Sequence, residues 1–314
     1  ALDKLEPAIQ HLIDELVVKE KKYSKTVKVG RTHLQDATPL TFGQELSGYI
    51  SALKHDLSYI RELKPTLYEL AIGGTAVGTG LNAAPGMTEK IAGKLSEVYG
   101  HKFEVKTNKF WGLAHHSGLD VVHGALKTLA ADMFKIAQDI RLLASGPRAG
   151  YHELNIPANE PGSSIMPGKV NPTQAEAVTM AAAKVFGNDT TITFASSQGN
   201  FEMNVFKTVI IASFLDSCDI LTGTITGFAD KMIHGLTVNE ERMDELLENS
   251  LMTVTALSPH IGYHAAAKIA QTADKEGTTL REAALKSGKV TEEQYDEWMD
   301  YMQMTNVDKS TPEE

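Results

Sequence analysis

Cysteine is almost missing from this sequence: it occurs once, at Cys218. One cysteine excludes a framework of internal disulfides and is typical of a reducing compartment. The chain also lacks any run of about 18 uncharged apolar residues, so we expect no membrane-spanning segment. Basic residues are in deficit, because 30 Lys and Arg stand against 40 Asp and Glu and the net charge is −10. This balance argues against nucleic acid or an anionic membrane surface as the main partner.

The first residues show no signal peptide, so a cytoplasmic protein is expected. Instead, apolar residues recur at helical spacing from the second position onward: Leu2, Leu5, Ile9, Leu12, Ile13 and Leu16. A chain that begins inside an amphipathic helix, without a preceding cap, is expected to come from a longer polypeptide.

Helical periodicity dominates the rest of the chain. Thr38 and Pro39 predict a helix start, Thr41 with Gln44 adds a capping pair, and Pro65 is expected to interrupt this helix near Lys64. Further helices are predicted over 113–143, 172–186 and 201–234, whereas the short strands predicted are 102–106 and 191–194. A helix of about 30 residues is about 45 Å long. The predicted class is therefore all-α, with an elongated bundle that subunits share.

Composition divides the chain into two predicted domains. Residues 1–242 are expected to form the helical bundle, and its longest irregular segment, 144–172, holds five prolines and four glycines. A loop of this length in a helical protein is usually functional. Residues 243–314 carry short charged helical patterns and are predicted to form a small separate helical domain.

The long loop contains a glycine-bounded motif at 162–172, GSSIMPGKVNP. Its glycine and lysine spacing does not match a phosphate-binding P-loop. The segment instead offers two hydroxyls, one cation and one carboxamide, a set that can bind a carboxylate and close over it. The candidate binding residues are Ser163, Ser164, Lys169 and Asn171. From spacing alone, a surface loop that ends at a proline-started helix is an equally good interpretation.

A second candidate site is the segment 30–36, which contains Thr32 and His33. Histidine is the side chain best suited to proton transfer near neutral pH, and Glu176 is a candidate to orient its imidazole. A packed or solvated histidine, and a solvated acid at a helix N-terminus, are the plainer interpretations of the same residues. No HExxH or CxxC motif occurs, and the adjacent His115 and His116 point in different directions on a helix, so no metal site is predicted.

Three motifs together resemble a known family. GSSIMPGKVNP is similar to the signature flap of the fumarase/aspartase superfamily. GRTHLQDATPLTFGQE at 30–45 and GNFEMNVFK at 199–207 resemble the class II fumarases. Within the superfamily, the Thr32–His33 pair favours the hydratase, because aspartases have Gln where His33 stands. The resemblance covers essentially the whole chain.

The resemblance implies a homotetramer with a central twenty-helix bundle and active sites built from three subunits. It also implies that the family's N-terminal domain precedes this chain, which would then hold only part of an active site. A eukaryotic source would make the mitochondrial matrix a second possible location.

The implied reaction is the reversible trans hydration of fumarate to L-malate, without a metal or an organic cofactor. By resemblance, Ser163 is the base and His33, oriented by Glu176, handles the water. Four further residues would bind the substrate: Thr32, Ser164, Lys169 and Asn171. Two alternatives stay open at this point, namely another fumarate-releasing lyase, such as an ammonia-lyase, and a helical oligomer without enzymatic activity.

Overall fold

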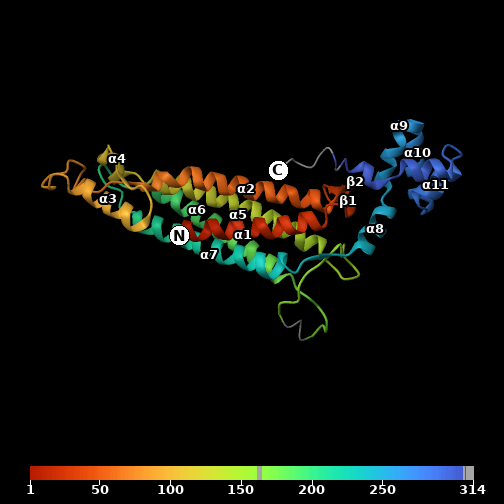
Figure 1. Ribbon diagram of the computed structural model, residues 1–314, viewed down its shortest axis with the longest axis horizontal. Coiled ribbons are helices and arrows are strands. Elements are labelled where there is room, and N and C mark those ends of the chain that lie inside the picture. The colour runs from red at the N-terminus through yellow and green to blue at the C-terminus, as the bar shows by residue number, and fades with distance from the viewer. Residues whose placement is uncertain (161–164, 307, 309–314) are drawn as a thin grey trace. The chain divides into compact units, whose positions relative to one another are not determined.

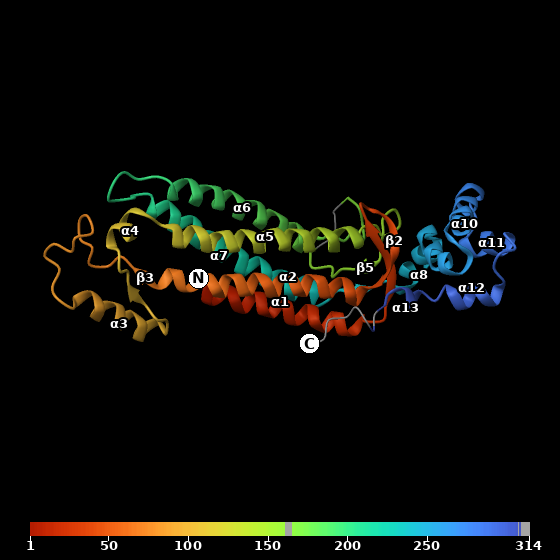
Figure 2. The ribbon, with the colours of Figure 1, turned by 90° about the horizontal axis from the view of Figure 1, so that it is seen from above.

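The computed structural model describes residues 1–160, 165–306 and 308. Helices dominate this part of the chain, as Figures 1 and 2 show, which confirms the all-α class. The α-helices are α1 (Leu2–Lys22), α2 (Phe42–Leu63), α3 (Met87–Tyr99), α4 (Lys109–Ala114), α5 (Ser117–Leu143), α6 (Thr173–Ser196), α7 (Lys207–Phe228), α8 (Glu240–Asn249), α9 (Ser258–Ile261), α10 (Tyr263–Glu276), α11 (Leu280–Lys286), α12 (Glu292–Trp298) and α13 (Tyr301–Met304). Two 3₁₀ segments, Lys64–Tyr68 and Leu251–Leu257, and one π segment, Ala229–Ile233, complete the helical elements.

Contacts divide the chain into two compact units. Unit 1 contains Ala1–Ile13, Ser51–Asp139 and Pro172–Met232. Unit 2 contains Asp14–Ile50, Ile140–Asn171 and Ile233–Glu314. Helices α1, α2 and α5 therefore contribute residues to both units. The domain boundary predicted after residue 242 stays a prediction.

Unit 1 is built around long helices whose apolar faces meet in its core. Helices α6 and α7 lie side by side along most of their length (Figures 1 and 2). The fully buried side chains recur every three or four residues, as amphipathic helices require. They include Leu5 and Ile9 of α1, Leu53 and Ile60 of α2, Leu126 and Leu129 of α5, and Ile210 of α7.

Helix α7 and the π segment that follows it are apolar on nearly every face. Lys207–Ile233 is long and apolar enough to cross a membrane by length and composition, and 39% of its most apolar stretch is buried in the chain. Several large side chains of α6 and α7 are exposed, among them Met180, Phe194, Ile211 and Leu215. A helix that is hydrophobic all round usually lies inside a larger core.

The strands are short and form three separate pairs. β1 (Val27–Thr32) and β2 (Gln35–Thr41) make an antiparallel hairpin. β3 (Glu69–Leu70) pairs in parallel with β4 (Glu104–Val105), and β5 (Leu154–Asn155) pairs with the antiparallel β6 (Thr237–Val238). The strand predicted over 102–106 is confirmed in β4.

The strand predicted over 191–194 is wrong, because these residues lie inside α6. Its β-branched residues favoured a strand locally, but the buried side chains of Asn188, Ile192 and Ala195 follow helical spacing. The helix predicted over 172–186 therefore extends to Ser196. The one predicted over 113–143 begins as α5 only at Ser117, and the one predicted over 201–234 begins at Lys207.

The helix start predicted at Thr38 and Pro39 is also wrong, since both residues belong to β2. The capping pair is confirmed: the Gln44 N–H donates to Thr41 Oγ1 at 3.0 Å, and the Thr41 N–H donates to Gln44 Oε1 at 2.8 Å. These reciprocal bonds start α2 at Phe42. The helix ends at Leu63, one residue before the predicted end, and Pro65 lies in the 3₁₀ segment that follows.

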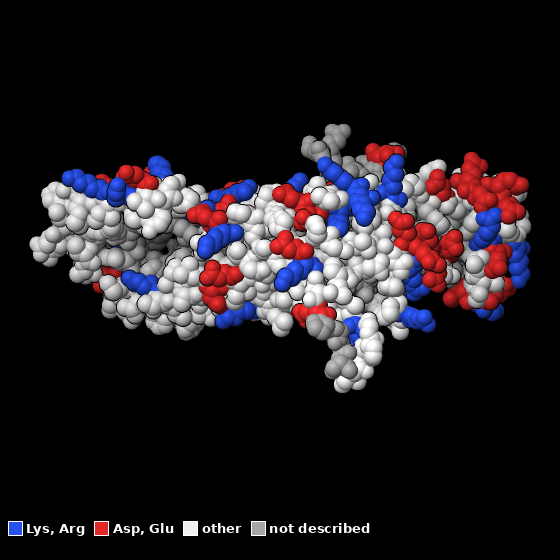
Figure 3. All heavy atoms as spheres, turned by 60° about the horizontal axis from the view of Figure 1, so that its bottom comes forward, with Lys and Arg blue, Asp and Glu red and all other residues white. Residues whose placement is uncertain are grey.

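The C-terminal helices of unit 2 enclose a core of their own. It includes Leu257, Ile269, Leu280 and Ala284, all nearly or fully buried. Reciprocal capping boxes start α11 at Thr279 and α12 at Thr291. Acidic side chains gather over this end of the chain in Figure 3, consistent with the negative net charge.

Candidate active site

The hairpin of unit 2 presents the Thr32–His33 pair at its tip. Thr32 pairs with Gln35, so His33 and Leu34 are the two central residues of the turn. Their φ angles are 57° and 60°, the left-handed values that a type I′ turn requires at both positions. Asn and Gly usually occupy such turns, because other residues in this region cost about 1–2 kcal/mol each. Backbone strain of this kind concentrates at functional sites, and the exposed side chain of His33 is free to meet a ligand.

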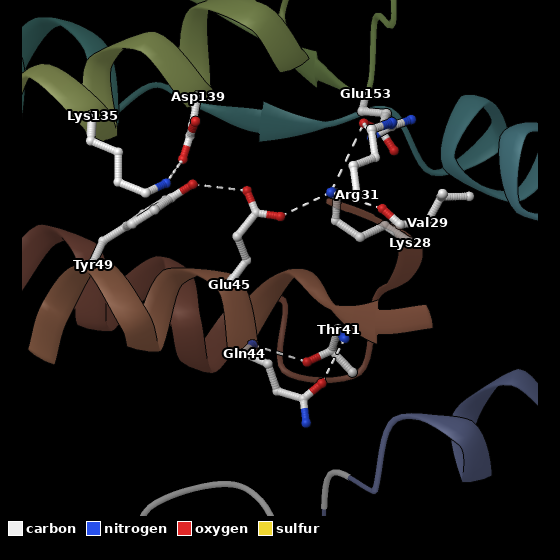
Figure 4. A network of polar contacts seen from close by, with 10 residues as sticks. All are labelled: Lys28, Val29, Arg31, Thr41, Gln44, Glu45, Tyr49, Lys135, Asp139 and Glu153. Atoms are coloured by element: carbon white, nitrogen blue, oxygen red, sulfur yellow. Dashed lines mark hydrogen bonds and ion pairs between the residues drawn. The ribbon is translucent and has the colours of Figure 1, made fainter. Parts of the chain in front are cut away.

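A buried ion pair fixes the other end of the hairpin to α2. Lys28 Nζ donates to Glu45 Oε2 at 2.9 Å, and Tyr49 Oη donates to Glu45 Oε1 at 3.0 Å (Figure 4). The Lys28 side chain is only 3% exposed, so its charge depends on these partners. The side chain of Val29 is buried as well. The end of the hairpin opposite the His33 turn is therefore held by buried side chains.

Lys169 and Asn171 lie in the described part of the long loop, also within unit 2. Both are exposed. The Lys169 N–H donates to Met166 O at 3.3 Å, and Gly168 has a φ of 80°, so a tight turn precedes the lysine. Ser163 and Ser164, the predicted base and its neighbour, lie outside the described residues.

Glu176 lies in the first turn of α6, in unit 1. Its N–H donates to Pro172 O at 3.1 Å, and its side chain is half-buried. A carboxylate at this position is stabilised by the partial positive charge of the helix N-terminus. Because His33 belongs to unit 2 and Glu176 to unit 1, the pairing of these two residues stays a prediction.

The site residues described in unit 2 thus supply one imidazole, one hydroxyl, one ammonium and one carboxamide, all facing solvent. Such a set can bind a carboxylate and transfer a proton. Among the described residues, no group of three or more His, Cys, Asp or Glu is arranged to hold a metal ion. Sequence reasoning missed the strained turn itself, although the alternation Val27-Lys28-Val29 before Gly30 is a signal for a strand.

Comparison with known proteins places this geometry in a family. The model of the family described as Lyase matches residues 1–187, and that of the Fumarase C C-terminus matches residues 254–306. "Fumarate hydratase class II" of Listeria monocytogenes serovar 1/2a is 54% identical over 304 residues, which are 97% of this chain and 67% of that protein. The protein of the same name from Bacillus subtilis is 56% identical over 295 residues, covering 94% and 64%.

A solved structure agrees with these sequence matches. The crystal structure of recombinant class II fumarase from Schistosoma mansoni has a TM-score of 0.92 and 41% identity, and the match covers 96% of this chain and 66% of that one. The helical bundle and the loop motifs define a lyase of the fumarase/aspartase kind. More narrowly, the chain belongs to the class II fumarase family, and it spans about two thirds of the length of these relatives.

Proposed function

We propose that this chain is part of a fumarate hydratase, which catalyses the reversible trans addition of water to fumarate to give L-malate. The observation that carries the proposal is the solvent-facing Thr32–His33 pair on a strained turn, in a chain that matches class II fumarate hydratases over nearly its whole length.

In the elimination direction, a base takes a proton from the carbon beside one carboxylate of L-malate. The C–O bond of the neighbouring carbon then breaks, a C=C bond forms, and water leaves with one further proton. Ser163 is the proposed base, activated by the surroundings of the loop. The charge that develops on the carboxylate requires a cation and preorganised donors, which Lys169 and Asn171 would supply together with Ser164 and Thr32.

His33 is the proposed acid–base group for the departing or attacking water. Its imidazole can hand a proton to the leaving hydroxyl or take one from water, a role that contributes about 10²- to 10⁴-fold to the rate. Glu176 would orient the imidazole, as carboxylates do in other acid–base pairs.

We further propose that the active enzyme is a homotetramer with composite sites. The exposed apolar side chains of α6 and α7 support this proposal, because packing against another subunit would bury them. Met180, for example, is 67% exposed and Phe194 is 64% exposed. The solvent-facing positions of His33 and Lys169 also leave the site open within one chain, although this chemistry needs a site that is closed to bulk solvent and holds only the reacting water. Other subunits would close it.

An ultraviolet assay tests the proposed reaction. Purified full-length protein is given L-malate in one cuvette and L-aspartate in another, and the fumarate formed is followed by its absorbance. We expect turnover of L-malate alone. Turnover of L-aspartate alone would overturn the hydratase and favour an ammonia-lyase, whereas silence in both would favour an assembly without this activity.

A further inference from the structure

A cleft of about 280 Å³ lies between α10 and the end of α11, in the C-terminal part of unit 2. Three of the side chains that line it are lysines, and among the described residues no Asp or Glu lines it. This composition is unlike its surroundings, because acidic side chains gather over this end of the chain (Figure 3). An anion is repelled by an acidic surface but attracted to a local group of ammonium charges. The cleft therefore favours an anionic ligand.

One face of α10 forms one side of the cleft. Its lining residues follow the three- and four-residue spacing that places side chains on the same face of a helix: Ala265, Lys268, Ile269 and Thr272. Ile269 is buried, whereas Lys268 is exposed. The cleft thus combines an apolar inner surface with a charged entrance.

The end of α11 and the turn that follows it form the other side. Ala283 and Lys286 lie one turn apart on α11. Gly288 has a φ of 66°, a left-handed conformation that glycine adopts without the clash that a Cβ causes. This turn ends the helix, and Lys289, directly after it, lines the cleft as well. The three ammonium groups thus come from α10, from α11 and from the turn.

Two of these ammonium groups have no acidic partner in the part of the chain that the structure describes. Lys286 Nζ forms an ion pair with Glu276 Oε2 at 2.7 Å. Lys268 and Lys289 form no such pair with a described residue. Like charges that share a cleft repel each other, and an anion between them replaces this repulsion by attraction. The charges of Lys268 and Lys289 are therefore available to a ligand.

The hydroxyl groups of the cleft contribute less. Thr272 Oγ1 donates to Lys268 O at 2.8 Å, and Ser287 Oγ donates to Ala284 O at 2.6 Å. Because both protons are already donated to backbone carbonyls, the ammonium groups are the donors that remain for a ligand. Among the described residues no arginine lines the cleft. The planar fork of arginine matches a carboxylate, whereas the ammonium of lysine is a compact point charge that suits phosphate.

We propose that this cleft binds a small organic phosphate. A phosphate group carries about two negative charges near neutral pH, and it lies between the ammonium groups of Lys268 and Lys289. The apolar part of the ligand packs on Ala265 and Ile269. The cleft shares no residue with the proposed active site, so the inference does not depend on the proposed reaction.

The experiment compares two small anions on the full-length protein. Phenyl phosphate is the probe and phenylmalonate is its control, because each carries an aromatic ring and about two negative charges near pH 8. Isothermal titration calorimetry at low ionic strength, where charges are least screened, measures the two dissociation constants. We expect phenyl phosphate to bind at least about fivefold more tightly. Equal affinities, or no measurable binding of phenyl phosphate, would overturn the proposal.

Two lysine variants of α10 assign the binding to the cleft. Lys268→Gln removes an ammonium group that lines the cleft, whereas Lys275→Gln removes an exposed one of the same helix that does not line it. Both side chains are exposed, so both variants should fold. We expect the dissociation constant of phenyl phosphate to rise about 3- to 10-fold in Lys268→Gln and less than about twofold in Lys275→Gln. Equal effects of the two substitutions would contradict the assignment.

Hydrogen–deuterium exchange locates the bound probe independently. Phenyl phosphate should slow exchange at amides within 265–289, because a ligand that joins α10 to the turn after α11 stabilises both. Lys268→Gln should remove most of this protection at the same probe concentration. Protection confined to residues 30–36 and 165–172 would overturn the inference, since the ligand would then occupy the proposed active site.

Discussion

His123 Nε2 lies 2.8 Å from Ser217 Oγ, deep between α5 and α7. On its other side, His123 Nδ1 lies 2.9 Å from Asp189 Oδ1, and Asn188 Nδ2 donates to Ser217 Oγ at 3.0 Å. Ser217, His123 and Asp189 are hydrogen-bonded in the order of a nucleophilic triad. His123 and Ser217 are fully buried, however, so no substrate reaches them. The network is instead a polar device that fixes how the helices of unit 1 pack.

The burial of His123 makes stability depend on pH. Desolvation lowers its pKa below the usual 6.5, although the hydrogen bond and charge of Asp189 oppose this shift. Below pH 6.5 the unfolded chain binds a proton that the folded chain resists, so the contribution of His123 to the free energy of unfolding should decrease as the pH falls from 7 towards 5. Urea denaturation of the unmodified protein and of His123→Gln across this range measures this contribution as the difference between the two slopes. Identical slopes in the two proteins would contradict the assignment.

The contribution of Asp56 to stability depends on pH in the opposite direction. Burial, and then the charge of Asp132 and a hydrogen bond with it, raise the pKa of Asp56 to about 7. The folded chain keeps this proton while the unfolded chain loses it near pH 4, so the contribution of Asp56 to the free energy of unfolding should decrease as the pH rises from 4 to 7. At pH 8, Asp56→Asn should increase the free energy of unfolding by on the order of 4 kcal/mol. Thermal denaturation at pH 5 and pH 8 tests this, with the exposed Asp244→Asn as control; equal Tm shifts at both pH values would contradict it.

The strain of the His33 turn can be measured at its neighbour. Leu34 is 62% exposed and has a φ of 60°, so Leu34→Gly should stabilise the protein by about 1 kcal/mol, since glycine adopts this conformation without the side-chain clash. Leu34→Ala is the matched control, because it removes the same apolar side chain but retains the Cβ. Equilibrium unfolding of both variants gives the difference. If glycine and alanine have the same effect, the turn stores no strain.

The proposed pairing of Glu176 with His33 predicts a change in the pH–rate profile. Glu176→Gln should lower kcat/KM for L-malate about 10- to 100-fold and move the limb of the profile that belongs to His33, because the imidazolium loses its counter-charge. The exposed Glu89→Gln on α3 serves as control. A full profile superimposable on that of the unmodified protein would show that Glu176 acts elsewhere.

The exposed apolar side chains of α6 predict the assembly state. Met180→Glu would place a charge where another subunit is proposed to pack, so the protein should dissociate into smaller species in native mass spectrometry. Val98 on α3 is similarly exposed, at 61% against 67% for Met180, and Val98→Glu should leave the assembly intact. An unchanged mass for Met180→Glu would exclude this face of α6 from the interface.

Sequence reasoning recovered the features that depend on local chemistry. The Thr41–Gln44 capping pair, the end of α2 near Pro65 and the short strand at β4 all follow from residue types within a few positions. Thr191–Phe194 shows the limit of this reasoning: its strand propensity is local, but packing of α6 against α7 decides its conformation.

The candidate site was only partly accessible from the sequence. The motif located Thr32 and His33, but nothing in the residue types announced that His and Leu occupy a turn that favours Asn and Gly. The ion pair between Arg31 and Glu153 joins residues far apart in the chain, and no local pattern predicts such a contact. Both features belong to the hairpin and exist only once β1 and β2 pair.

The junction between β2 and α2 has a mechanical consequence for this site. β2 ends at Thr41 and α2 begins at Phe42, with no residue between them. The chain therefore has no hinge at this point, and the His33 turn is a stiff extension of a 22-residue helix. Any rotation or sliding of α2 moves the imidazole with it, so the reach of the proposed acid–base histidine depends on the position of the whole helix and not on loop motion.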